Sequence, residues 1–131
     1  MASIFAFKTR SPDRDRQTDA VRFEHLLKTL GQLSGEIDAE KTGIRNRYEA
    51  VSANAAFLVE AMDNDAVSTR RAAEMDQLTE ALKNCLRRVD TLGRQGEFVA
   101  GLRRLVDDFI ADGRNADDAM PPARGEAAPA P

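Results

Sequence analysis

The sequence has no tryptophan, one cysteine, one histidine and one tyrosine among its 131 residues, and aromatic side chains make up only 5% of it. Strands favour aromatic side chains, so this composition argues against a strand-rich domain. Charged residues reach 31%, which suits helices that expose broad faces and bury narrow ones. The length fits one domain. We therefore expect a single all-α domain.

The lone cysteine, Cys85, excludes a disulfide within the chain, and no spacing resembles a zinc site. A reducing compartment fits this usage, and we expect the cytoplasm. The carboxylates do not follow the Glu-x-x-His repeat that builds metal sites in helical bundles. No nucleotide or catalytic motif is present either, so we expect no cofactor, no metal and no enzymatic activity.

The chain also lacks a strong positive charge and a long apolar run. Its formal net charge is −3, which gives no general attraction to nucleic acid or anionic lipid. A membrane span needs about 20 apolar residues, and the short apolar run at residues 4–7 is too brief even for a secretory signal. We expect residues 1–10 to form a flexible leader, with docking of residues 4–7 into a partner's groove as the alternative.

An apolar repeat runs through residues 23–62 and organises the chain. Its members are separated by alternating steps of four and three residues, and all but Ser34 and Lys41 are apolar. This is the heptad pattern by which a long helix pairs with another helix, and the two polar members are expected to fix the register. The members are Phe23, Leu27, Leu30, Ser34, Ile37, Lys41, Ile44, Tyr48, Val51, Ala55, Leu58 and Met62.

The ends of this helix and a second repeat predict an antiparallel, coiled-coil-like helical hairpin. Residues 11–13, Ser-Pro-Asp, are a strong helix start, and residues 63–65, Asp-Asn-Asp, favour a turn after Met62. A turn near residue 65 makes facing residues sum to about 130, which brings Cys85 level with Ile44. The second repeat is Met75, Leu78, Leu82, Cys85, Val89 and Leu92.

Glycines interrupt the second repeat at residues 93–96 and face Gly35 in this register. They predict a bend or a close crossing of the helices, followed by a third helical segment after Gly93 that ends near Gly113. The helical hairpin domain then covers residues 11–113. Residues 114–131 are rich in Asn, Asp, Ala and Pro and are expected to be a disordered tail.

Apolar residues widen the stripe at the ends of the helices that are far from the turn, beyond what a two-helix seam covers. We expect these residues to bind a partner. The partner is a second copy in a homodimeric four-helix bundle or, in a monomer, the last segment folded back as a third helix. The residues are Leu26, Leu33, Phe98, Leu102, Leu105 and Phe109.

His25 lies two residues past Phe23, on the side of the helix opposite the stripe, so its imidazole should be exposed. Residues 24–29 are similar to the phosphorylated-histidine helix of histidine phosphotransfer and dimerisation domains, in which a basic residue, here Lys28, follows the acceptor histidine. Thr29 stands where the phosphotransfer pattern has Gly, and Leu30 where the kinase pattern has Pro. The resemblance implies signalling through His25. A solvated surface histidine is the structural alternative.

These patterns favour a non-enzymatic interaction protein, such as an adaptor, scaffold or export-type chaperone, that binds a protein through an apolar helical face. The alternative is a histidine phosphotransfer protein that uses His25. Arginine pairs such as Arg103 and Arg104 have acids within four or five residues. We expect them to form ion pairs along their own helix rather than to contact nucleic acid.

Overall fold

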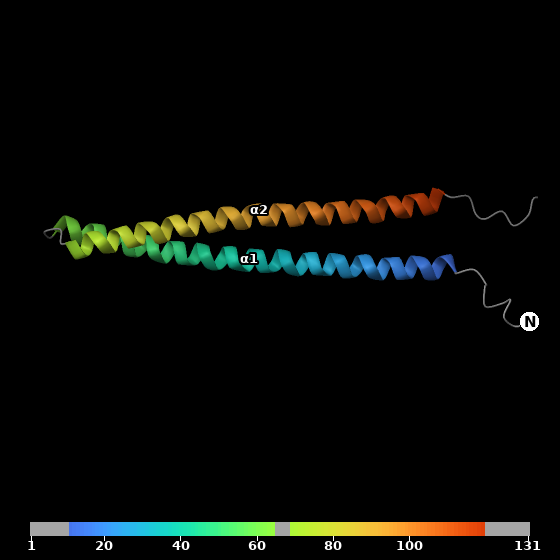
Figure 1. Cartoon of the computed structure of the whole chain (residues 1–131), viewed down its shortest axis with the longest axis horizontal. Helices are drawn as coiled ribbons and strands as arrows, with labels where there is room; N and C mark the ends of the chain where they lie inside the picture. Colours follow the sequence, from blue (N-terminus) through green and yellow to red (C-terminus); the bar gives the residue numbers. More distant parts are fainter. Residues whose placement is uncertain (1–10, 65–68, 120–131) are drawn as a thin grey trace, which may run out of the picture. The chain divides into compact units, whose positions relative to one another are not determined.

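The computed structural model describes residues 11–64 and 69–119. These ranges contain two helices and no strand: α1 (Pro12–Asn64) has 53 residues and α2 (Thr69–Ala119) has 51 (Figure 1). Contacts between the two helices make them a helical hairpin. The predicted all-α hairpin is therefore confirmed.

The contacts divide the chain into two compact units. The first unit combines Met1–Leu30 with Gly101–Pro131, and the second unit is Gly31–Ala100. Each unit contains a stretch of α1 and a stretch of α2, and each has its own contacts between the two helices.

Helix α1 begins where the sequence predicts. The backbone N–H of Arg14 donates to Ser11 Oγ at 3.5 Å, and that of Asp15 donates to the Ser11 carbonyl at 3.1 Å. Pro12 occupies the first helical position, where no N–H partner is required. Asp13 and Asp15 place negative charge in the first turn, which stabilises the positive end of the helix dipole.

The predicted stripes face inward. Every member of the α1 repeat is buried or half-buried, including Ser34 and Lys41, and so is every member of the α2 repeat. Cys85 is buried, as predicted for a packed thiol. The buried apolar residues of the described chain are Leu30, Ile37 and Ala55 on α1, and Cys85, Leu92 and Val99 on α2. The heptad pattern therefore located the seam.

Polar contacts join the helices within the second unit. Arg88 donates from Nε and Nη2 to the two carboxylate oxygens of Glu40, at 3.1 and 3.0 Å. Nearer the connection, Arg71 Nη1 donates to the Ala61 carbonyl at 3.2 Å. Both contacts fit the antiparallel register predicted from a turn near residue 65. The connection itself, residues 65–68, lies outside the described ranges, and the predicted proximity of Cys85 and Ile44 stays a prediction.

Helix α2 has no break at its glycines. Residues 93–96 are helical, and α2 continues past Gly113 to Ala119. The residues expected to form a third helical segment are therefore the continuation of α2. Each interior glycine costs a helix about 1 kcal/mol relative to alanine. Packing of the apolar stripe along the rest of so long a helix offsets that cost.

The glycines do not mark a close approach of two backbones. Among the described residues, a Cβ placed on Gly35 or Gly93 would meet no atom within 4 Å. A Cβ on Gly96 would lie 3.7 Å from Cγ2 of Ile37, which is an ordinary contact. The predicted close crossing is wrong, because Ile37 faces Gly96 while Gly35 lies on the exposed side of α1.

The ends of the chain are described only in part. The predicted leader, residues 1–10, lies outside the described ranges, and so does the docking predicted for residues 4–7. Of the predicted tail, residues 114–119 belong to α2 and are exposed. Residues 120–131 lie outside the described ranges.

Candidate interaction surface

Apolar side chains of both helices build the seam of the first unit. An aromatic contact supplements it: the rings of Phe23 and Phe109 have centroids 5.3 Å apart and planes inclined at 46°, within the usual range for favourable aromatic pairs. The seam residues are Phe23, Leu27 and Leu30 on α1, and Leu102, Val106 and Ile110 on α2; all are buried or half-buried.

Near the start of α1, acidic residues of both helices act electrostatically on one arginine. Arg16 forms a hydrogen-bonded ion pair with Asp13. This contact, together with the negative charges of Asp117 and Asp118 on α2, raises the pKa of the Arg16 guanidinium. The effect of the two α2 carboxylates fits the antiparallel pairing within the first unit.

Large apolar side chains remain exposed on α2 in the first unit. Leu105 is 66% exposed and Phe109 is 62% exposed. They are four residues apart, so they lie one above the other on the same side of the helix. Leu105 is about 100° around the helix from the seam residue Val106. Leu105 and Phe109, with the flanking charges Arg104 and Asp108, are called the outer face below.

The charges of the outer face have no ion-pair partner in the described part of the chain. Arg104 and Asp108 are exposed, and no described carboxylate lies within 4.0 Å of the Arg104 guanidinium. The Arg104 Nη2 instead lies back along α2, 4.0 Å from the position of a Cβ on Gly101. Within residues 11–64 and 69–119, neither Arg103 nor Arg104 forms the ion pair along the helix that the sequence predicts.

Ion pairs of this kind do form elsewhere on α2. Arg70 reaches Glu74 at 3.5 Å, and Arg94 reaches Asp90 at 3.4 Å. The first has the longer glutamate side chain, and the second has the acid before the base, which is the more favourable order on a helix. Arg104 and Asp108 have neither advantage.

The predicted partner-binding residues fall into three groups. Leu26, Leu105 and Phe109 are exposed in the first unit. Leu102 is half-buried in the seam of that unit. The last two, Leu33 and Phe98, belong to the second unit and are exposed there.

Other exposed apolar residues were missed in the sequence. In the second unit Phe57 is 71% exposed, and Val59 and Leu86 are exposed as well; in the first unit Val21 is exposed. Phe57 and Val59 lie on either side of the stripe residue Leu58, and Leu86 follows the stripe residue Cys85. The signal that could have found them is an apolar residue outside the heptad positions.

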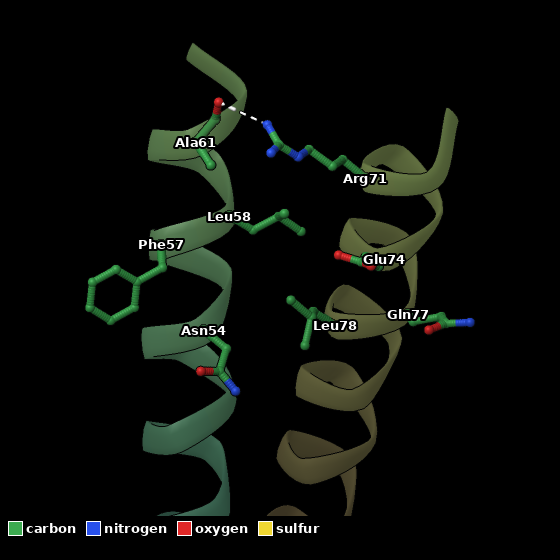
Figure 2. Close-up of a pocket in the computed structure, with 8 residues that line it drawn as sticks. All are labelled: Asn54, Phe57, Leu58, Ala61, Arg71, Glu74, Gln77 and Leu78. Atoms are coloured by element: carbon green, nitrogen blue, oxygen red, sulfur yellow. Dashed lines mark hydrogen bonds between the residues drawn. The ribbon is translucent and has the colours of Figure 1, made fainter. Parts of the chain in front are cut away.

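A groove in the second unit includes Phe57, and its volume is about 500 Å³. Figure 2 shows Leu58 and Leu78 directed into the space between the helices, Arg71 crossing to the Ala61 carbonyl, and Phe57 directed away from α2. The lining offers apolar, amide and charged groups but no histidine, cysteine or hydroxyl. Its residues are Asn54, Phe57, Leu58, Ala61, Arg71, Glu74, Gln77 and Leu78.

His25 is exposed, as predicted from its position opposite the stripe. Its backbone carbonyl accepts a hydrogen bond from Thr29 Oγ1 at 3.0 Å. The neighbouring Lys28 is exposed too. A phosphoryl donor could therefore approach this imidazole from solvent.

The described residues contain no group of three or more His, Cys, Asp or Glu side chains placed to hold a metal ion. In the same ranges, neither helix has a stretch long and apolar enough to cross a membrane. Comparison of the chain with protein-family models, curated proteins and solved structures found no match.

Proposed function

We propose that this chain is a non-enzymatic interaction protein that binds a helical protein partner through the first unit. The observation that carries the proposal is the exposure of Leu105 and Phe109 on one side of α2. Adjacent exposed apolar side chains are typical of surfaces that another protein covers. Leu26 and Val21 are also exposed in this unit.

The free energy of burying these apolar side chains supports the proposed binding. Complete burial of a leucine or phenylalanine side chain stabilises by about 1.5–3 kcal/mol. Since Leu105 and Phe109 are only about one third buried in the hairpin, most of that free energy is available to a partner. Part of it offsets the entropy lost on association.

The mode of binding follows from the shape of the site. A side of one helix with apolar residues four apart fits another helix, which completes a bundle or lies in a groove. An adaptor, a scaffold or a chaperone for export would all use such a contact. A cytoplasmic location fits the single cysteine.

Site-specific photo-crosslinking in the native cells tests the proposal. A photo-reactive phenylalanine analogue at Leu105 should give a covalent adduct with a protein. The matched control is the same analogue at Asp107, an exposed position two residues further and about 200° around α2. Equal labelling from both positions, or no adduct from position 105, would contradict binding through the outer face.

Phosphotransfer through His25 is the second candidate, and the exposure of its imidazole supports it. Incubation of the full chain with phosphodonor histidine kinases would test it. Acid-labile phosphate should appear on the wild-type chain and be absent from His25→Gln. Equal incorporation by the two chains would reject His25 as the acceptor.

A further inference from the structure

We infer that the partner on the outer face is a second copy of this chain, with α2 of one copy antiparallel to α2 of the other. The inference rests on the proposed function and names its partner. It starts from two observations in the first unit: Leu105 and Phe109 are exposed together, and the adjacent Arg104 and Asp108 have no ion-pair partner among the described residues.

The order of the charges selects the antiparallel arrangement. Arg104 precedes Asp108 by four residues, with Val106 midway between them. A two-fold axis that crosses α2 at the level of Val106 brings Arg104 of each copy level with Asp108 of the other. The contact thus forms twice, as in any two-fold symmetric interface. A parallel arrangement would instead oppose Arg104 to Arg104.

The same two-fold axis also brings apolar residues of the two copies together. Leu105 is adjacent to the axis, so the two copies of Leu105 lie within one helical turn of each other. Phe109 comes level with the segment 102–103 of the other copy, where Leu102 is half-buried at the edge of the seam. The charges then lie on the solvent side of this apolar strip, as in an interface with an apolar centre and a polar rim.

Apart from the contact of the Phe23 ring with Phe109, no described part of the chain covers this face. Helix α2 continues to Ala119, and the structure describes no third helix that folds back over Leu105. One pair of helix faces is small compared with standard protein interfaces, which bury about 1,200–2,000 Å². The dimer should therefore dissociate in the micromolar range.

Charge exchange between two variants tests the inference. In Arg104→Glu alone, both symmetric contacts oppose acid to acid, and in Asp108→Lys alone, both oppose base to base. Each variant should be monomeric by light scattering coupled to gel filtration at about 500 µM, a concentration well above a micromolar dissociation constant, at which the wild type is dimeric. An equimolar mixture should form a heterodimer, because every contact again joins opposite charges.

Two further variants complete the design. Asp107→Lys makes the same change of charge on the opposite side of α2 and should leave the wild-type dimer intact. Leu105→Asp should abolish the dimer while far-ultraviolet circular dichroism retains the helical signal, because Leu105 is not part of the seam. It is a better probe than Leu102, whose half-buried side chain also contributes to the hairpin.

The outcomes separate the inference from the proposed function. A wild-type mass that stays at the 14.4 kDa of one chain at every concentration overturns the second-copy inference. So does a dimer that persists in both single charge variants. If position 105 crosslinks to a different protein while the chain is monomeric, the proposed function stands and the inference fails. A self-adduct from position 105, with restored pairing in the mixture, supports both.

Discussion

Leu92 and Leu86 are both leucines of α2 in the second unit, yet Leu92 is 2% exposed and Leu86 is 55% exposed. Leu92→Ala should lower the free energy of unfolding by about 2–4 kcal/mol, because it leaves a cavity in a well-packed site. Leu86→Ala should change it by less than about 0.5 kcal/mol. Urea unfolding followed by circular dichroism measures both. Similar losses in the two variants would mean that the seam does not run where the structure places it.

Glu40 and Arg88 form the bidentate ion pair between the helices of the second unit, with side chains 43% and 47% exposed. A double-mutant cycle with Glu40→Ala and Arg88→Ala should give a coupling free energy of about 0.5–1 kcal/mol. Solvent screening keeps it small, and the paired geometry keeps it above zero. The comparison cycle is the more exposed Asp90 and Arg94 pair, which should give about half as much or less. A coupling within error of zero for Glu40 and Arg88 would show that the pair contributes nothing to the hairpin.

At the scale of the helices, the interior glycines of α1 lower its stability. Gly35 and Gly43 are exposed, and a Cβ on either would meet no described atom within 4 Å. Gly35→Ala and Gly43→Ala should each raise the free energy of unfolding by about 0.5–1 kcal/mol, since alanine is the better helix former. Urea denaturation midpoints would show the gain. A loss of stability in either variant would reveal a close neighbour, or a local distortion of α1, in solution.

Much of the helical architecture could be predicted from the sequence. Every position that the four-three spacing predicts from Phe23 to Met62 is buried or half-buried, because the spacing of apolar residues follows directly from helix geometry. The start of α1 was equally predictable, since Ser11 and Pro12 act locally on the first turn. These are properties that a short window of residues determines.

The sequence could not predict whether the glycines break α2, nor which residues outside the stripes are exposed. Whether residues 93–96 break α2 depends on two free energies: the small local cost of the glycines and the stabilisation from packing along the whole helix. The second cannot be read from a short stretch of sequence. Strict four-three spacing after Val99 would turn Arg103 inward, but Leu102 is the half-buried residue. The exposure of Phe57 was also hidden, because it depends on which neighbours come near.

For the molecule as a whole, the small number of buried side chains limits stability. The described chain buries Leu30, Ile37, Ala55, Cys85, Leu92 and Val99, and no polar or charged residue. Stability in domains with small cores often depends on association. A dimer that forms only from folded chains adds stability by mass action. The melting temperature should therefore rise with protein concentration.

A hundredfold increase in concentration should raise the melting temperature by at least about 4 °C, because the added stability grows with the logarithm of the free concentration. Thermal melts followed by circular dichroism at micromolar and higher concentrations provide the measurement. Leu105→Asp is the control, and its melting temperature should not depend on concentration. A wild-type melting temperature that is equally constant would argue against coupling between folding and association.

The sparse seam also has a consequence for turnover in the cell. Proteases cleave chains that have opened locally or globally, and a hairpin with few buried side chains opens more often than one with a large core. Binding of a second copy reduces the open fraction, so the half-life of each molecule should lengthen as its expression level rises. Pulse-chase labelling at two expression levels would detect this, and equal half-lives would contradict it. Cells making little of this protein would then remove each molecule faster than cells making much.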